Sequence, residues 1–303
     1  MDWIGYTHNV HILKVIVLYF LQMLCFDGLL KAQSGDNGTI VFDQFFQNYY
    51  MYNPASHDSA DVVRVSLGNR TMTGLFDGVN RIYADASFRI QHHSPLRFSR
   101  IGFFVHSGHD GDFISRNRVY GRYSWTTGVG ARSSVSAGLS IGVVNYAFLG
   151  SQAGAGGASS ALDGNAGIWY IRRKLKIGFS WQQLLRPVLE PLNQKFILTP
   201  YYNLNAIYTT DISAYISLST HLYIRYQANE SIRWNVAPVF LIHSIFETGV
   251  NYQHQNGVAL LFGIKSIQFG PNTFRFMGSF LLSTKKLSRT SDNVFELSVG
   301  YSL

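Results

Sequence analysis

Four potential metal ligands, His106, His109, Asp110 and Asp112, fall within seven residues of one another in the stretch H-S-G-H-D-G-D. Imidazole and carboxylate groups at this density could hold a divalent cation. The same stretch is rich in Gly and Asp, the residues that form tight turns between strands without any metal. We therefore expect a turn with no metal and no cofactor, and a divalent-metal site is the alternative.

A hydrolase would need a serine, a histidine and an acid or amide that converge in space. The chain has many serines and ten histidines, but their spacing singles out no such group. The Gly- and Ser-rich stretch 150–164 lacks the GK[ST] ending of a phosphate-binding loop and is predicted to be a flexible loop. The sequence thus predicts no catalytic residue and no enzyme activity.

The composition indicates a protein that faces a solvent other than water. Only 14% of the residues are charged, against about 25% in soluble proteins, and 15% are aromatic. The mean hydropathy is nevertheless only +0.04, and no stretch after the N-terminal region approaches the ~20 apolar residues of a spanning helix. Alternating lipid-facing and lumen-facing residues of a β-barrel reconcile these two facts.

The net charge of +8 could indicate nucleic-acid binding. The 25 Lys and Arg residues are spread along the chain, however, and only Arg172 to Lys176 resembles a cluster. We therefore predict no nucleic-acid partner.

Residues 1–32 are predicted to be a cleaved secretory signal, with Lys14, the apolar run Val15 to Phe26, and Leu30-Lys31-Ala32 before the cleavage point. A transmembrane anchor is the rival, but about a dozen apolar residues are too few to span comfortably. The only cysteine, Cys25, lies in this segment, so the mature chain is predicted to contain no disulfide.

Residues 33–60 form a second segment, centred on F-D-Q-F-F-Q-N-Y-Y-M-Y from Phe42 to Tyr52 and followed by N-P-A. The aromatic residues recur at helical spacing, which predicts a short helix or turn rather than a strand. So much aromatic surface must pack on something, either inside a barrel as a plug or on a partner protein. The candidate residues for either role are Phe45, Phe46, Tyr49, Tyr50, Tyr52, Asn53 and Pro54.

Residues 61–303 alternate with period two, which predicts a transmembrane antiparallel β-barrel. The last strand, V-F-E-L-S-V-G-Y-S-L, turns Leu297 to the lipid and Ser298 to the lumen. A Lys or Arg should therefore cost more at Leu297 than at Ser298 or at Ser217, another lumen position. We expect about fourteen strands, near 61–70, 80–91, 97–107, 114–125, 130–147, 161–173, 174–184, 197–208, 212–226, 230–243, 244–255, 257–268, 272–284 and 293–303.

Two features of the predicted lumen concern its contents. Ser134, Ser136, Gly138, Ser140 and Gly142 share one face of a strand and leave room for something inside. Lumen-facing arginines either select anions in a pore or pair with acids such as Asp85 and Glu296 to crosslink the interior.

The chain resembles the PorP/SprF-like family, outer-membrane proteins of the Bacteroidetes type IX secretion system. The resemblance is carried by the segment from Phe42 to Ala55, similar to the family's F-x-Q-Y/F and N-P-A pattern, and by Gly167-Ile168-Trp169-Tyr170 leading into Ile177-Gly178-Phe179-Ser180. The chain departs from the family at Ala55-Ser56-His57, where members commonly have N-P-A-x-A-G.

The resemblance implies an outer-membrane barrel without catalytic activity. Such a barrel assists export or surface attachment of a secreted partner protein, together with other secretion-system components and the outer-membrane lipid. A pore or facilitator for small solutes is the alternative function.

Overall fold

The computed structural model describes residues 42–57, 61–73, 78–92, 97–130, 132–150, 156–192, 195–254, 256–283 and 293–303. The predicted secretory signal, residues 1–32 with Cys25, lies outside the described residues. Residues 33–41 and 58–60 of the second predicted segment also lie outside them. The boundaries predicted for these segments therefore stay predictions.

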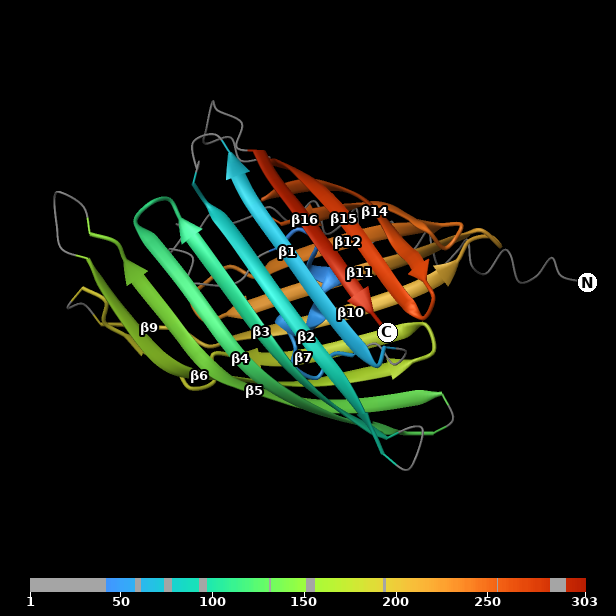
Figure 1. The fold of residues 1–303 in the computed structure, drawn as a ribbon, viewed down its shortest axis with the longest axis horizontal. Helices are drawn as coiled ribbons and strands as arrows, with labels where there is room; N and C mark the ends of the chain where they lie inside the picture. The colour runs from blue at the N-terminus through green and yellow to red at the C-terminus, as the bar shows by residue number, and fades with distance from the viewer. Residues whose placement is uncertain are drawn as a thin grey trace, which may run out of the picture. The chain divides into compact units, whose positions relative to one another are not determined.

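Fourteen strands form a closed barrel in which each strand pairs antiparallel with its neighbours and β1 pairs with β16 (Figure 1). The predicted barrel and its strand number are confirmed. The strands are β1 Val63–Thr73, β2 Asn80–Gln91, β3 Phe98–Asp110, β4 Ile114–Gly128, β5 Ser133–Phe148, β6 Gly157–Arg172, β7 Leu175–Gln182, β10 Tyr201–Asp211, β11 Ile216–Gln227, β12 Arg233–Ile242, β13 Phe246–Gln253, β14 Gly257–Phe269, β15 Asn272–Ser283 and β16 Asn293–Ser302.

Strand β16 shows why the sequence forms a barrel. Phe295, Leu297 and Val299 are exposed on its outer face, whereas Glu296 and Ser298 are buried on its inner face. This arrangement places apolar side chains toward lipid and polar ones toward the lumen, as the period-two pattern predicts. Closure against β1 satisfies the backbone groups that a free sheet edge would leave unpaired in lipid.

The structure corrects the predicted loop at 150–164. Strand β6 begins at Gly157 and pairs with β5 from Phe148↔Gly157 onward, so half of the Gly- and Ser-rich stretch belongs to the barrel wall. The small residues have a packing reason there, because a Cβ at Gly157 would overlap the carbonyl oxygen of Pro191. Glycine here permits the backbone of another segment to approach closely, and composition alone does not distinguish this role from flexibility.

The structure also shortens the strand predicted at 212–226. Residues 212–215 reverse the chain between β10 and β11, and the backbone N–H of Ile212 donates to the carbonyl of Ile216 at 2.9 Å. The apolar and polar residues of this turn happen to continue the alternation. The period-two pattern of apolar and polar residues therefore does not by itself show where the chain changes direction.

A two-stranded hairpin, β8 Val188–Leu189 and β9 Phe196–Ile197, lies in the connection between β7 and β10. Leu189 and the adjacent Leu198 are buried in the same apolar cluster as Tyr146 of β5. The connection begins and ends at the same mouth of the barrel, opposite to the mouth where β1 begins. Its buried leucines pack against the wall there.

Residues Phe42–His57, which we name the lumen segment, contain two 3₁₀ turns, η1 Phe45–Gln47 and η2 Tyr49–Met51. In Figure 1 this segment, in blue, lies among the barrel strands. All of its residues are buried except Tyr49, which is partly buried. The predicted plug-like aromatic segment is thus confirmed as part of the fold. Within the described residues, no helix is long and apolar enough to cross a membrane.

Candidate functional site in the barrel lumen

The lumen segment contacts the wall on all sides of the barrel. Its side chains and backbone make hydrogen bonds or aromatic contacts with strands on opposite sides of the lumen. The wall residues involved are Arg70 of β1, Tyr83 of β2, His106 of β3, Arg122 of β4, Ser136 of β5, Trp169 of β6, Ser180 of β7, Asn203 of β10, Tyr223 of β11, Asn251 of β13, Met277 of β15 and Glu296 of β16.

The first anchor of the lumen segment is the carboxylate of Glu296. Its two oxygens accept hydrogen bonds from the backbone N–H groups of Asp43 and Gln44, at 2.7 and 2.9 Å. The Gln44 side chain donates in turn to the carbonyl of Glu296 at 3.0 Å and accepts from the hydroxyl of Ser298. These bonds tie the beginning of the lumen segment to the closing strand.

Arg70 of β1 neutralises the charges of this anchor. Its guanidinium donates to the Asp43 carboxylate and lies 3.5 Å from that of Glu296. All three side chains are almost completely buried, so each charge must be paired. Gln253 donates to the Asp43 side chain, and Asn251 donates to its backbone carbonyl at 2.7 Å. The predicted crosslinking role of Glu296 is therefore confirmed, but its partners lie on the lumen segment as well as on the wall.

The predicted aromatic residues pack on aromatic wall residues. Phe45 contacts Tyr223 with ring centroids 5.6 Å apart, and Phe46 stacks on His221 at 4.8 Å. Tyr49 lies between, with its ring 5.4 Å from Trp169 and its hydroxyl 2.7 Å from Nδ1 of His221. Such pairs stabilise beyond the area that they bury, so this cluster holds η1 against β11 and η2 against β6 and β11.

Tyr50 contacts the wall through its ring face. The guanidinium of Arg122 lies 4.0 Å from the ring centroid and also pairs with the Asp85 carboxylate at 2.7 Å. A desolvated cation–π contact of this kind contributes about 2 kcal/mol. Glycine at position 102 makes space for the arginine, since a Cβ there would lie 2.6 Å from Nε of Arg122.

The backbone carbonyl of Tyr52 accepts hydrogen bonds from three wall side chains. Ser180 donates at 2.6 Å, Gln182 at 2.8 Å and Asn203 at 3.2 Å. The Tyr52 ring packs on Tyr223 at 5.1 Å. Strands β7, β10 and β11 thus fix the chain just before the N-P-A residues.

Asn53 makes the reciprocal contacts with the backbone of the wall. Its side-chain amide donates to the carbonyls of Ile168 on β6 and Phe179 on β7, at 3.0 and 3.2 Å. Its side-chain oxygen accepts the N–H of Ala55 at 2.9 Å, which closes a tight Asx turn. Every polar atom of the completely buried side chain is therefore used.

Pro54 and Ala55 lie against a wall position that has no side chain. A Cβ at Gly138 would approach the Pro54 carbonyl and the Ala55 nitrogen to 2.6 Å, closer than real atoms allow. Gly138 pairs across the sheet with Gly167, which faces Asn53. The predicted room on the small-residue face of β5 is confirmed, and the N-P-A residues occupy it.

Burial keeps the tyrosines of the lumen segment neutral. It raises the pKa of Tyr52 well above its ordinary value, and the neighbouring Tyr223 and Glu296 raise it further. Burial likewise raises the pKa of Tyr49, although the positive charge of Arg275 acts in the opposite direction. Both phenols are therefore neutral at physiological pH: Tyr49 hydrogen-bonds His221, and Tyr52 packs on Tyr223.

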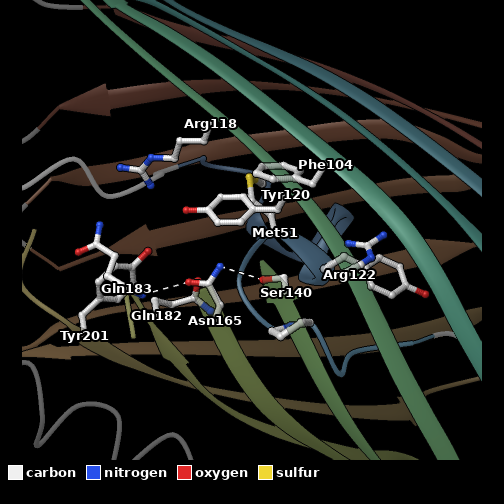
Figure 2. A pocket seen from close by; sticks show the side chains of 12 residues that line it. Met51, Phe104, Arg118, Tyr120, Arg122, Ser140, Asn165, Gln182, Gln183 and Tyr201 are labelled. Atoms are coloured by element: carbon white, nitrogen blue, oxygen red, sulfur yellow. Dashed lines mark hydrogen bonds between the residues drawn. The ribbon is translucent and has the colours of Figure 1, made fainter. Parts of the chain in front are cut away.

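A small cavity lies beside Met51 and Tyr120, on the side of the lumen segment that faces Gln183 (Figure 2). Figure 2 shows Asn165 between Ser140 and Gln183. The Asn165 amide donates to the Ser140 hydroxyl at 2.9 Å, and its side-chain oxygen accepts from the backbone N–H of Gln183 at 3.0 Å. The cavity volume is about 20 Å³, and a single water needs roughly 10–15 Å³. This space suits a water molecule, not a solute.

The structure separates the residues of the H-S-G-H-D-G-D stretch. His106 is buried and faces the lumen, whereas His109, three residues further along β3, is exposed. Residues 111–113 form the predicted turn between β3 and β4. Among the described residues, no group of three or more His, Cys, Asp or Glu side chains is placed to hold a metal ion.

The stretch Gly138 to Gly142, G-L-S-I-G, matches the serine-hydrolase pattern, a match that spacing arguments had not singled out. That pattern performs catalysis when it forms a sharp turn from a strand into a helix. Here the stretch continues through the middle of β5, and the Ser140 hydroxyl accepts a hydrogen bond from Asn165. The match therefore forms no nucleophile elbow.

The comparisons with known proteins give one family. Residues 34–301 match the family model described as "Type IX secretion system membrane protein PorP/SprF". The chain belongs to the PorP/SprF family. It is accordingly an outer-membrane barrel associated with type IX secretion, a family whose members work with secretion-system components and substrates. No curated protein matches the chain.

Two solved structures with a similar fold are a toluene transporter and a monoaromatic hydrocarbon channel. The toluene transporter TodX of Pseudomonas putida has a TM-score of 0.55 and 10% identity, with 89% of this chain and 96% of TodX covered. The monoaromatic hydrocarbon channel CymD has a TM-score of 0.53 and 11% identity, with 80% of this chain and 89% of CymD covered. At these identities the likeness to this PorP/SprF protein is one of fold alone.

The structure brings all seven predicted candidate residues together in the lumen of this PorP/SprF barrel. Sequence reasoning named Glu296 but missed Asp43 and Gln44, which hold the start of the lumen segment, and their other wall partners such as Arg70 and Asn251. The signal was present, because two adjacent polar residues within an aromatic run must satisfy their hydrogen bonds when the run is buried. The alternation of apolar and polar residues along the strands could not show which residues of β1 and β16 bind Asp43 and Gln44.

Proposed function

We propose that the protein is a non-enzymatic outer-membrane barrel that assists type IX export or surface attachment of a specific partner protein. In this proposal the lumen segment is a fixed plug, and the partner acts at the barrel rather than passing through an open channel. The residues proposed for the plug are Phe45, Phe46, Tyr49, Tyr50, Tyr52, Asn53 and Pro54.

The observation that carries the proposal is the contact of the lumen segment with strands around the whole barrel. Barrels of more than about eight strands have space inside for a ligand or an aqueous channel. Here that space contains buried aromatic rings, a paired charge cluster at Arg70 and hydrogen-bonded amides. A lumen in which such a segment is held by contacts around the wall suits an accessory barrel of a secretion system better than a general solute pore.

The lengths of the connections support an orientation. Outer-membrane barrels have short periplasmic turns and longer extracellular loops. At the mouth where β1 begins, residues 173–174 alone join β6 to β7, and residues 270–271 join β14 to β15. At the other mouth, residues 183–200 join β7 to β10. We infer that the first mouth is periplasmic and the second extracellular.

The extracellular connection offers a surface for a partner. Val188 and Ile197 are cross-strand neighbours in the β8–β9 hairpin and are 50% and 58% exposed. Leu185 in the same connection is 55% exposed. Apolar side chains grouped in this way are typical of protein–protein contacts, which suits a partner that is held at the cell surface.

Crosslinking and mass spectrometry in the native outer membrane would test the proposal. We expect crosslinks from Lys195, which is 72% exposed beside the hairpin, to one secreted protein. Replacing Val188 and Ile197 together with Asp should abolish these crosslinks while the folded barrel remains in the membrane. Normal export and attachment of all secreted proteins after deletion of the barrel would contradict the proposal.

A facilitator for small solutes is the second candidate function. It is favoured by the fold, which the barrel shares with the hydrocarbon channels TodX and CymD. The two candidates differ in a bilayer experiment. An unmodified barrel that conducts ions steadily, or that takes up hydrocarbons into liposomes, would support the facilitator and contradict the plugged accessory barrel.

A further inference from the structure

Strand β6 has an edge that β7 does not cover, at the mouth opposite to the start of β1. Strand β6 pairs with β5 along its whole length, from Phe148↔Gly157 to Ser133↔Arg172. Its pairing with β7 covers only residues 166–172. On the β7 side, residues 157–165 therefore have no partner strand in the barrel wall.

The connection that follows β7 turns away from this edge. Gln183 and Arg186 adopt left-handed backbone conformations, with φ of 58° and 49°. The N–H of Leu184 donates to the carbonyl of Gly164 at 2.9 Å, and no further backbone hydrogen bond joins the described part of the connection to β6. The connection then crosses the lumen side of the barrel wall, where its buried leucines pack.

The backbone groups that remain without a partner belong to Ala158, Ser160 and Leu162. In a strand the N–H and C=O of one residue point to the same side, and those of the next residue point to the other side. The Gly164 carbonyl points toward the connection, so residues 158, 160 and 162 point the same way. Within the described ranges no hydrogen bond reaches their backbone groups on that side, and all three residues are exposed.

A row of polar side chains on the outer face places this edge above the lipid. Asn117 of β4, Asn145 of β5 and Ser160 are cross-strand neighbours. Asn145 donates to the Ser160 hydroxyl at 2.8 Å, and Asn117 accepts from Ser107 of β3 at 2.7 Å. The next outward residue along β6, Leu162, is apolar and 63% exposed, so lipid contact ends near it. An open edge is excluded from hydrocarbon but is compatible with water at this level.

We propose that this edge binds an extended segment of the partner protein, which adds one strand to the sheet beside β6. The free N–H and C=O groups recur every second residue, about 6.8 Å apart at roughly 3.4 Å per residue, and an extended polypeptide backbone matches that repeat. Residues 157–163 read G-A-S-S-A-L-D and contain no Lys, Arg or Pro that would discourage pairing. The inference rests on the proposed export role, which supplies the partner.

A second copy of the barrel fits this edge less well than a free segment. Strands of outer-membrane barrels tilt by about 35–45° from the membrane normal. Two copies inserted in the same direction would therefore bring their β6 edges together at about 70–90° to one another, which permits no continuous ladder. An extended segment of a secreted protein can align with β6 without this restriction.

Amide hydrogen exchange of the full chain, measured by mass spectrometry, would test the proposal. In the purified barrel in detergent, the amides of Ala158, Ser160 and Leu162 should exchange quickly because they are unpaired. In isolated native outer membranes they should exchange at least tenfold more slowly. Membranes from cells that lack type IX secretion should again show fast exchange. Residues 166–172 pair on both sides and serve as the internal control.

Variants at Ser160 would show that the edge itself is responsible. Ser160→Pro removes one edge N–H, so the remaining edge amides should lose their slow exchange in native membranes. Ser160→Ala is the matched control, because it also loses the hydroxyl contact with Asn145 but keeps the N–H. Heat-modifiability on gels would establish that each variant is folded. Ala158→Pro, nearer the strand end, replaces Ser160→Pro if that variant does not fold.

Four results would overturn the proposal. These are equal exchange in purified barrel and native membranes, slow exchange that grows with the concentration of purified barrel, slow exchange that persists without type IX secretion, and equal effects of Ser160→Pro and Ser160→Ala. The second result would indicate a second copy of the chain. Fast edge exchange in native membranes, with export lost on deletion of the barrel, would contradict this inference alone. Normal export after the deletion would contradict the proposed function whatever the edge amides do.

Discussion

Asn53 of the lumen segment and Gly167 of β6 are in such close contact that a Cβ at position 167 would overlap the Asn53 side-chain oxygen. The same asparagine donates hydrogen bonds to the carbonyls of Ile168 and Phe179. The position of the lumen segment therefore depends on a glycine in the wall, which leaves space for Asn53, as much as on the N-P-A residues themselves.

The replacement Gly167→Ala should displace the N-P-A residues from β6. Overpacking of a filled interior costs about 1–3 kcal/mol, so the unfolding temperature should fall. Ion conductance in planar bilayers should rise if the lumen segment is a plug. Gly121→Ala is the matched control, because Gly121 is exposed on the outer face of β4 and a Cβ there meets nothing within 4 Å. Equal effects of the two replacements would contradict this account of the wall.

The replacement Arg70→Met should be strongly destabilising. It leaves the carboxylates of Asp43 and Glu296 buried together without a cation, and breaking a buried pair costs about 3–5 kcal/mol. Lys174→Met is the control, because its pair with Asp211 is mostly exposed and contributes at most about 1 kcal/mol. Urea unfolding in detergent would measure both. Adding Glu296→Gln to the first variant should restore part of the loss, and no recovery would argue against unpaired charge as the cause.

The barrel could be predicted from the sequence because apolar and polar side chains alternate along each strand. Leu297 must face lipid and Glu296 must not, and this requirement is local to the strand. Strand ends were less certain. In the sequence Gly157 looks like part of a loop and Ile212 like part of a strand, but Gly157 pairs with Phe148 in the wall and Ile212 closes a turn with Ile216.

A positive charge introduced at Leu297 or Ser298 of β16, or at Ser217 of β11, should separate three environments. Leu297→Arg places a charge in lipid and should cost about 2–4 kcal/mol near the midplane. Ser217→Arg of β11 should cost less than Leu297→Arg, because Ser217 lines a cavity of about 210 Å³ in the lumen and does not face lipid. The sequence predicted the same tolerance at Ser298, but its hydroxyl donates to Gln44 of the lumen segment. Ser298→Arg should therefore also destabilise the barrel, by about 1–3 kcal/mol. Equal tolerance at 217 and 298 in unfolding measurements would show that Gln44 does not occupy this position.

The plug-like packing of the aromatic residues could be stated from the sequence only as one of two alternatives. Six rings in eleven residues must be covered, but the covering surface can belong to the same chain or to a partner. In this structure the rings are covered by wall residues such as His221 and Trp169. Their spacing in the sequence gives no indication that they meet.

Replacement of Tyr49, Tyr50 and Tyr52 together with Ala should loosen the lumen segment without unfolding the barrel wall. The variant loses the hydrogen bond to His221 and the ring contact with Tyr223, both on β11, and the cation–π contact with Arg122 on β4. The unfolding temperature should therefore fall and conductance in planar bilayers should appear.

The matched control for this triple replacement removes three tyrosine rings that do not touch the lumen. Tyr208, Tyr215 and Tyr226 are 54%, 65% and 49% exposed, so their replacement with Ala should leave the barrel closed. If the lumen triple variant stays closed and stable but loses its partner in native membranes, the aromatic residues act in partner binding instead. If it keeps its stability, its closed state and its partner, neither role holds, because a filled lumen must respond to the loss of three buried rings.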